Sequence, residues 1–261
     1  MKKNNPIFRN SFFAKGAMAV LISASLVSCT KNNEFANVST SSQANIAKVS
    51  NFLATSTGVD VNQVSYQPDT KNFIISNDIA ITEKDANDRM TASTGTTTEQ
   101  WKYNYLISRT QVTNIDYFFE SSVPDSWKSA TRKAIQNWNA VNGTILYLRE
   151  TSVQSSSNVV VKMGYSTSNW VAQAYLPSYN GLPGYQITIN SNYNSLSDSY
   201  KIFAITHEMG HTFGLMHTDQ QSGIFINGTP TTDSKSVMNS VVLPWQAFTA
   251  GDIKAVQTLY P

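Results

Sequence analysis

The residues with the clearest chemistry lie in one stretch, which reads His207-Glu208-Met209-Gly210-His211-Thr212-Phe213-Gly214-Leu215-Met216-His217. On an α-helix, His207 and His211 lie one turn apart on the same face, so two ring nitrogens can bind one metal ion. Glu208 lies beside them, where its carboxylate can hold a metal-bound water without binding the metal itself. Gly214 can take the left-handed conformation that ends a helix and turns the chain, which returns His217 as a third ligand. The fourth tetrahedral position is left for water, as in a catalytic zinc site.

The distribution of histidines favours metal binding over chance. A lone His-Glu-x-x-His pattern also occurs in helices that bind no metal, where the histidines cap the helix or pack in the core. This chain contains three histidines, and all of them lie in the motif. We therefore predict that His207, His211 and His217 bind zinc, and that Glu208 is the general base of a hydrolase.

The eleven-residue pattern resembles the signature of the metzincin metallopeptidases. This family places a methionine turn beneath the zinc, and Ser236-Val237-Met238-Asn239 resembles it, with Met238 as the methionine. Some metzincins add a tyrosine ligand two residues later, but Ser240 occupies that position here. Thr218, which follows the third histidine, is nearer to the serine of matrixins than to the residues of other branches.

Within the metzincins, the chain resembles the dual-action HEIGH metallopeptidases of bacteria. Their motif corresponds to His207-Glu208-Met209-Gly210-His211, with Met209 in place of isoleucine, and the resemblance extends to Gly228-Thr229-Pro230 and Leu259-Tyr260-Pro261. It implies an α/β (α+β) fold: a twisted, mostly parallel sheet with an antiparallel edge strand, an active-site helix, a methionine turn and a C-terminal helix.

Val171-Ala172-Gln173-Ala174-Tyr175 resembles the edge strand that matrixins lay alongside their substrate. An exposed edge offers unpaired backbone groups, so we expect an extended peptide to add along Ala172, Gln173 and Ala174. Matrixin-like domains often hold a second zinc through a histidine between two alanines on this strand. Gln173 occupies that position, and an amide is a poor zinc ligand, so we expect one zinc per chain.

Residues 1–28 are typical of a bacterial export signal, with a basic start and an apolar run at residues 16–28. That run is too short to cross a bilayer as a helix. Leu26-Val27-Ser28-Cys29 resembles a lipobox, whose cysteine is acylated. The alternative is an ordinary signal peptide followed by an unrelated cysteine. We expect a lipoprotein of the bacterial cell envelope, anchored in the outer membrane by preference, or a secreted protein.

Composition limits the remaining possibilities. Cys29 is the only cysteine, so an internal disulfide is excluded and stability must come from burial and metal. Four of the 19 basic residues precede Cys29, which leaves 15 basic against 17 acidic residues. The formal charge of +2 therefore gives no reason to expect a nucleic-acid partner.

Residues 29–98 are predicted to be a tether followed by a small propeptide-like region, with a mere spacer as the alternative. Residues 30–43 are rich in Ser, Thr and Asn, which predicts a flexible tether. A short helix is expected at residues 44–55, a strand around Asp78 and a helix at residues 83–90, before a Ser/Thr/Gly-rich linker. Because no cysteine follows Cys29, a thiolate cannot cap the zinc, but a carboxylate can, and Asp78 is one candidate.

Residues 99–261 are predicted to form the catalytic domain. Strands are expected at residues 112–118, 144–148, 158–163, 172–176 and 186–189, with a helix from Pro124 to about Asn142. Ile202, Ile205, Met209 and Phe213 form a stripe that would pack the active-site helix beneath the sheet. Thr249-Ala250-Gly251-Asp252 has the form of a capping box that starts a C-terminal helix.

These patterns together predict an exported, lipid-anchored zinc endopeptidase, which hydrolyses peptide bonds of an extended protein or peptide substrate with metal-activated water. Leu243-Pro244-Trp245 is expected to form a wall of the pocket for the residue after the cleaved bond. Two alternatives stay open: a non-catalytic envelope-binding lipoprotein that contains zinc, and a zinc amide or ester hydrolase of another specificity.

Overall fold

A computed structural model describes residues 33–92, 102–220 and 222–261. The chain divides into two units, Met1–Thr40 and Ser41–Pro261, and the sheet lies in the second. The strands are β1 (Val64–Gln67), β2 (Asn72–Ile75), β3 (Ile79–Thr82), β4 (Ile115–Phe119), β5 (Leu148–Thr151), β6 (Val159–Gly164), β7 (Ala172–Tyr175) and β8 (Gln186–Asn190). The α-helices are α1 (Asn33–Thr57), α2 (Glu83–Ala92), α3 (Arg109–Val112), α4 (Asp125–Asn139), α5 (Asp198–Thr212) and α6 (Ala250–Leu259).

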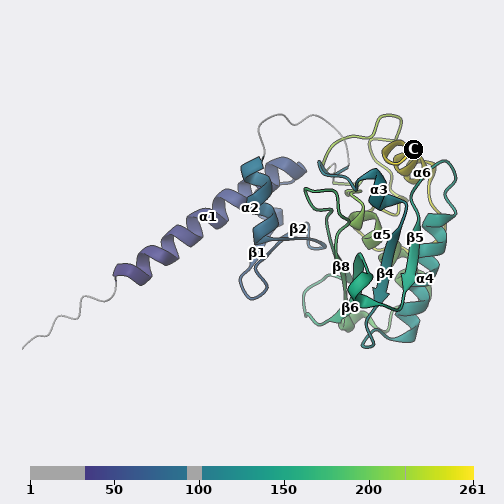
Figure 1. Cartoon of the computed structure of the whole chain (residues 1–261), viewed down its shortest axis with the longest axis horizontal. Coiled ribbons are helices and arrows are strands. Elements are labelled where there is room, and N and C mark those ends of the chain that lie inside the picture. Colours follow the sequence, from purple (N-terminus) through teal and green to yellow (C-terminus); the bar gives the residue numbers. More distant parts are fainter. Residues whose placement is uncertain (1–32, 93–101, 221) are drawn as a thin grey trace, which may run out of the picture. The chain divides into compact units, whose positions relative to one another are not determined.

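The eight strands form one sheet in the order β1-β2-β3-β7-β8-β6-β4-β5. Strands β5, β4, β6 and β8 run parallel to one another, and β7 pairs antiparallel with β8. β4 and β5 lie beside each other and are joined through α4, as in a parallel crossover unit (Figure 1). The predicted mixed α/β fold is therefore confirmed, including its mostly parallel sheet.

Helices α4 and α5 pack against each other and against the sheet (Figure 1). Trp127 and Trp138 of α4 are fully buried, so both tryptophans belong to the core. The Trp138 indole N–H donates to the carbonyl of Thr206 at 3.0 Å, and its ring meets that of Phe213 edge-on. A buried indole is stable only with such a partner, so this contact fixes α4 against the active-site helix.

Helix α5 is buried almost throughout its second half, which is unusual for a helix that carries charged chemistry. Of the predicted apolar stripe, Ile205, Met209 and Phe213 are fully buried, whereas Ile202 is only partly buried. The hydroxyl of Thr212 lies 2.8 Å from that of Tyr117 on β4, so the end of the helix is tied to the sheet.

The C-terminal end of the chain also braces the active-site helix. The predicted capping box is confirmed: the Thr249 side chain accepts from the Asp252 N–H, and the Asp252 carboxylate accepts from the Thr249 N–H. Beyond α6, the Tyr260 hydroxyl donates to the Phe213 carbonyl and accepts from the Ile107 N–H at 3.2 Å. Tyr260 is 2 % exposed, so its phenol is a buried link between the two ends of residues 102–261.

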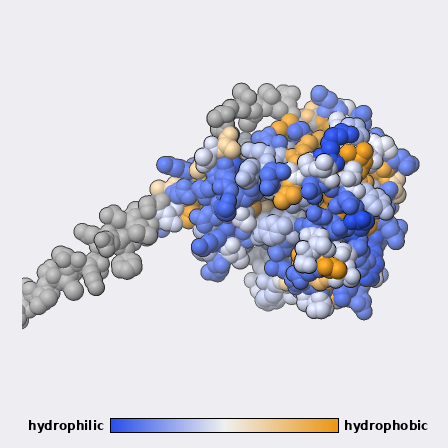
Figure 2. Space-filling view, viewed as in Figure 1, coloured by the Kyte–Doolittle hydropathy of each residue, from blue (hydrophilic) through white to orange (hydrophobic). Residues whose placement is uncertain are grey.

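A second apolar cluster joins the N-terminal part of the second unit to the catalytic part. It contains Val49 and Leu53 of α1 and four side chains of the β2–β3 hairpin, packed with Tyr103, Leu176 and Met216. The four hairpin residues are Phe73, Ile75, Ile79 and Ile81. On the surface, Figure 2 shows hydrophilic residues over most of the visible face, with apolar residues in small separate patches.

Several predicted boundaries need correction. Helix α1 begins at Asn33, where a tether is predicted up to residue 43, because extending an existing helix costs less than nucleating one. Strand β5 begins at Leu148 instead of residue 144. Residues before it are engaged elsewhere, since the Ile145 N–H and the Thr144 hydroxyl both donate to the Tyr260 carbonyl. The predicted strand start at residue 112 is replaced by α3.

The region around Asp78 is a hairpin, and the prediction of one strand there is wrong. β2 pairs antiparallel with β3 from Ile75↔Ile79 outward, so residues 76–78 form the connecting loop. Ser76 and Asn77 have φ values of 52° and 77°, in the left-handed region, which Asn tolerates better than most residues.

The predicted signal peptide, the lipobox and Cys29 lie outside the described residues. The proposed domain boundary at residue 98 does too. No helix in the described part of the chain is both long and apolar enough to span a membrane.

Candidate active site

Helix α5 and the turn after it bring the three histidines together. His207 and His211 project from the same face, with their Nε2 atoms 2.9 Å apart. Gly214 has φ of 98°, and a Cβ at this position would come within 3.0 Å of Leu106. Only a glycine fits this turn without strain, and the turn returns His217 to the site. The His217 Nε2 atom lies 3.2 Å from that of His211 and 3.3 Å from that of His207.

The second ring nitrogen of each histidine has a hydrogen-bond acceptor beside it. The Nδ1 atoms of His207, His211 and His217 lie 2.7 Å from the Val237 carbonyl, 2.8 Å from the Leu215 carbonyl and 3.1 Å from Oε1 of Gln220. A carbonyl or amide oxygen can only accept, so the proton of each neutral ring belongs on Nδ1. The three Nε2 lone pairs then face one another without a proton between them, which is a stable arrangement only around a cation.

The triangle of nitrogens has the size that zinc requires. With Zn–N bonds of about 2.0–2.1 Å, tetrahedral geometry places the ligand nitrogens about 3.3 Å apart. The observed separations of 2.9, 3.2 and 3.3 Å therefore match a zinc site. Within residues 33–92, 102–220 and 222–261, one group of potential ligand atoms meets such geometry, and it consists of Asp78, His207, His211 and His217.

Asp78 is the member of this group that comes from outside the motif. Its Oδ2 atom lies 3.0 Å from Nε2 of His217 and 3.5 Å from that of His207. Burial opposes ionisation of Asp78, but the neighbouring His217 and His207, in their protonated forms, outweigh it, so the pKa of Asp78 lies well below the ordinary value. Asp78 is therefore an anionic oxygen beside the three nitrogens.

Glu208 is the other carboxylate at the site. It is 3 % exposed, and its Oε2 atom is buried with no hydrogen-bond partner among the described residues. Burial, and then the nearby charge of Asp78, raise the pKa of Glu208 well above its ordinary value. Glu208 and His207 line a cleft of about 340 Å³ together with Trp170, Ala172 and residues 239–242. A buried, unpaired carboxylate in a cleft is a strong proton acceptor.

The methionine turn packs directly beneath the histidines. Met238 is 2 % exposed, and a Cβ at Gly210 would lie 2.4 Å from its sulfur, so only glycine allows this approach. The turn is held by Asp252, whose carboxylate accepts from the Ser236 hydroxyl at 2.5 Å and from the Val237 N–H at 3.1 Å. Burial raises the pKa of Asp252 against the opposing effect of these hydrogen bonds.

Ser240, two residues after the methionine, forms hydrogen bonds with Asp219. Its hydroxyl donates to Asp219 at 2.5 Å and its N–H at 2.9 Å. Thr218, after the third histidine, donates its N–H to the Met238 carbonyl at 3.0 Å. Thr218 and Asp219, which follow His217, are thus both hydrogen-bonded to the segment that contains the methionine turn.

The expectation that Ala172, Gln173 and Ala174 form an exposed edge is wrong for this chain. β7 has β3 on its outer side, in parallel register with Ile79 opposite Ala174. The Ala174 N–H donates to the Asp78 carbonyl at 2.9 Å, and the Gln173 side chain donates to the Asn77 carbonyl at 2.6 Å. Strand pairing between residues so distant in sequence leaves no trace in the pattern of either strand.

Gln220 and Asp252 are parts of the site that the sequence motifs do not predict. Gln220 orients His217, and Asp252 holds the turn that orients His207 through Val237. The sequence pattern predicts Asp252 only as a helix cap. A signal for its second role exists, because an acid that caps a helix close after a methionine turn can also serve the backbone of that turn.

The sheet, the active-site helix with its three convergent histidines and the methionine turn define a metzincin-like zinc metallopeptidase. The chain belongs to the dual-action HEIGH metallo-peptidase family, whose model matches residues 73–260. It is accordingly a zinc metalloendopeptidase, and the matched residues include the β2–β3 hairpin as well as the histidine motif.

Similarity to solved structures is distant. Two structures of myroilysin share 13 % and 11 % identity with this chain, each with a TM-score of 0.42. They cover 57 % of this chain and 80 % and 84 % of theirs. High choriolytic enzyme 1, a hatching enzyme zinc-protease from Oryzias latipes, shares 15 % identity with a TM-score of 0.40 and covers 60 % of this chain and 93 % of its own. No curated protein sequence matched the chain.

Proposed function

We propose that the protein is an exported, lipid-anchored zinc endopeptidase in which Glu208 is the general base. The observation that carries this proposal is the convergence of three Nε2 atoms beside a buried carboxylate whose Oε2 atom has no hydrogen-bond partner among the described residues. Burying a carboxylate oxygen without a hydrogen-bond partner destabilises a fold. A role for Glu208 as the acceptor of a substrate proton accounts for a carboxylate that destabilises the fold.

The site assigns distinct tasks to its residues. His207, His211 and His217 would hold zinc, which when bound polarises the scissile carbonyl and lowers the pKa of water. Glu208 accepts a proton in the cleft and passes it to the leaving amine. The raised pKa of Glu208 suits this exchange, since a group that both takes and gives a proton works best near the pH of its surroundings.

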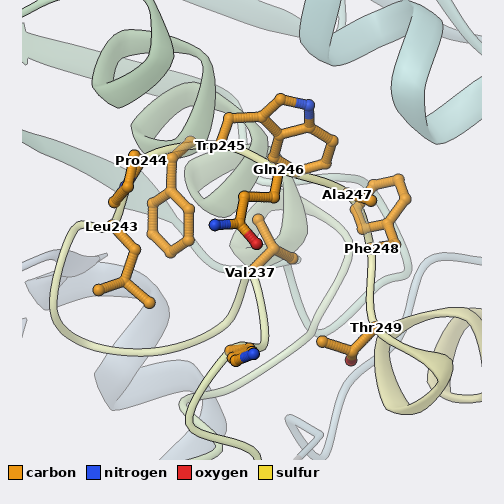
Figure 3. Close-up of a pocket in the computed structure, with 10 residues that line it drawn as sticks. Val237, Leu243, Pro244, Trp245, Gln246, Ala247, Phe248 and Thr249 are labelled. Atoms are coloured by element: carbon orange, nitrogen blue, oxygen red, sulfur yellow. The ribbon is translucent and has the colours of Figure 1, made fainter.

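A separate pocket suits an apolar substrate side chain. It has a volume of about 310 Å³ and is lined by residues 243–249 together with Phe203, Lys235 and Val237 (Figure 3). Two of its walls contact the metal site directly, because the Phe203 ring stacks on His207 and the Val237 carbonyl accepts from the same ring. We assign this pocket, with Leu243, Pro244 and Trp245 as a wall, to the residue that follows the cleaved bond.

Export and anchoring belong to the same proposal and rest on the sequence of residues 1–29. Acylation of Cys29 would hold the enzyme at a bacterial membrane, with residues beyond it on the far side from the cytoplasm.

One experiment separates this function from its alternatives. Zinc-loaded protein and its Glu208→Gln variant are incubated with casein and with a peptide library, with and without a chelator. Cleavage by the wild type that is lost in both the variant and the chelated sample supports the proposal. Zinc binding without cleavage of any peptide, ester or simple amide, by either the intact chain or its Asp78→Asn variant, would support a non-catalytic binding role. Cleavage of esters or amides alone would support another hydrolase.

A further inference from the structure

The carboxylate of Asp78 occupies the open side of the histidine triangle. A catalytic zinc site with three histidine ligands leaves its fourth position to water or substrate. Here the Oδ2 atom of Asp78 lies at 3.0 and 3.5 Å from two of the three Nε2 atoms, the same spacing that separates the nitrogens from one another. Carboxylate oxygen is an accepted zinc ligand, so this arrangement supplies four protein ligands in place of three.

The same hairpin also occupies the strand that a peptide substrate would need. An extended peptide adds to a sheet by pairing with the free N–H and C=O groups of its edge. On β7 those groups are taken by β3: the Ala174 N–H donates to the Asp78 carbonyl at 2.9 Å and the Leu176 N–H to the Ala80 carbonyl at 3.3 Å. One segment therefore covers both the metal and the substrate strand.

The loop that presents Asp78 is held in a demanding conformation. Both residues before Asp78 have positive φ values, which cost conformational energy in a residue other than glycine. The Asn77 carbonyl is fixed by a 2.6 Å hydrogen bond from the Gln173 side chain on β7. The residue at the expected position of a second zinc ligand thus serves instead to hold this loop.

Packing behind the hairpin makes the contact durable. Phe73, Ile75 and Ile79 are 0–1 % exposed and pack with Leu176 and Met216, which flank the site in sequence. Freeing the loop would expose these apolar side chains to water, which the hydrophobic effect opposes.

Helix α2, which follows the hairpin, adds a polar anchor. Arg89 is fully buried, donates to the Pro177 carbonyl at 2.6 Å and lies over the ring of Tyr103 at 4.7 Å. It also pairs with Asp85 on its own helix. A buried guanidinium that hydrogen-bonds the residue just beyond β7 holds the hairpin region at the substrate strand.

We propose that Asp78 is the fourth protein ligand of the zinc, and that the β2–β3 hairpin keeps the chain in a self-inhibited form until it is displaced. The inference rests on the proposed peptidase function only for its activity readout. Whether the Asp78 carboxylate competes with an added ligand for the metal can be measured without any peptide cleavage.

The test uses the full chain loaded with zinc or with cobalt(II), whose visible absorption reports its ligands. Asp78→Asn keeps the shape of the side chain but removes its charge and most of its metal affinity. Asp69→Asn, on the exposed turn between β1 and β2, is the matched control. Acetohydroxamate is the probe, because it binds the metal but is too small to need the substrate strand.

We expect Asp78→Asn to bind one zinc, to change the cobalt spectrum and to bind acetohydroxamate at least about tenfold more tightly than the wild type, since a site open less than a tenth of the time weakens apparent affinity by that factor. Gln173→Ala, which removes one hydrogen bond to the loop, should give a smaller gain of about fivefold. Asp69→Asn should behave as the wild type.

Equal acetohydroxamate affinity and equal cobalt spectra in the wild type and Asp78→Asn would overturn the proposal. Peptide cleavage, measured on the same samples, separates this result from failure of the proposed function. If the probe and spectra respond but no variant cleaves peptide, the ligand assignment holds and the peptidase function fails. If all variants cleave equally and no spectrum changes, the peptidase function holds and the self-inhibited form does not exist.

Discussion

Replacing Asp252 by alanine tests how far the methionine turn supports the metal site. The Asp252 carboxylate is 3 % exposed and accepts three hydrogen bonds, from the Ser236 hydroxyl at 2.5 Å, the Thr249 N–H at 2.9 Å and the Val237 N–H at 3.1 Å. Asp252→Ala leaves two buried donors, on Ser236 and Val237, and one partly buried donor, on Thr249, without an acceptor. Each such loss costs about 1–3 kcal/mol.

The burial of the charge itself reduces this figure. The pKa of Asp252 is raised, because burial outweighs the hydrogen bonds. The ionised carboxylate is therefore less stable in the fold than in water, and its removal recovers part of the lost stability. Taking a value near the middle of the range for the three donors and subtracting for burial, we expect Asp252→Ala to lower the free energy of unfolding by about 3 kcal/mol.

The same substitution should weaken zinc binding. The Val237 N–H donates to the Asp252 carboxylate, which fixes the position of residue 237, and the Val237 carbonyl lies 2.7 Å from Nδ1 of His207. Loss of a residue that orients a metal-binding histidine costs about 10- to 100-fold in metal affinity. Asp252 acts on His207 only indirectly, through two successive hydrogen bonds. We therefore expect zinc affinity to fall by about 10-fold, the lower end of this range.

Guanidinium unfolding, followed by tryptophan fluorescence in excess chelator, measures the stability without metal, and competition with a zinc indicator measures affinity. Asp198→Ala is the control, since Asp198 lies exposed in the first turn of α5 and contributes about 0.3–1 kcal/mol through the helix dipole. Asp252→Asn, which retains one acceptor oxygen, should fall between them. A stability loss below about 1 kcal/mol, with unchanged zinc affinity, would refute this account of the turn.

Three further predictions concern the metal, the base and the anchor. Glu208→Gln should retain one zinc but lose about 10²- to 10⁴-fold in peptide cleavage, measured in both the wild-type and Asp78→Asn backgrounds; more than about a tenth of the parent rate would remove Glu208 from its role. Elemental analysis of dialysed protein should give close to one zinc per chain, because Gln173 replaces the histidine of a second site; a second equivalent that survives His207→Ala would contradict this. Cys29→Ser should abolish labelling by radioactive palmitate and release the protein from membranes, and equal labelling of the two forms would exclude the lipobox.

The metal-binding motif could be predicted because its geometry is local. The spacing of His207 and His211 places them on one helix face in any helical structure, and Gly214 allows the turn to His217 that its φ of 98° now provides. The mostly parallel sheet followed from the family resemblance and from strands that alternate with helices. These features depend little on contacts between residues that are distant in sequence.

The partner of β7 could not be predicted in the same way. Ile79 and Ala174 lie opposite each other in the sheet although ninety-odd residues separate them, and both strands are short. Pairing of this kind is decided by the whole fold, because an apolar four-residue strand is compatible with many neighbours. For the same reason the sequence alone does not single out Asp78 among the acids of its region, whereas the sheet pairing places its carboxylate beside His217.

The place of Tyr260 in the fold sets the order in which the site can be completed. Its carbonyl accepts from Thr144 and Ile145, and its hydroxyl joins Ile107 to Phe213 at the end of α5. None of these contacts can form before residue 260 has been synthesised. Pairings over such long stretches of chain are slow to form, because their loop-closure entropy is lost before any contact compensates it. The end of the active-site helix is therefore secured only once Tyr260 has packed between Ile107 and Phe213, so this contact closes late in the folding of residues 102–261.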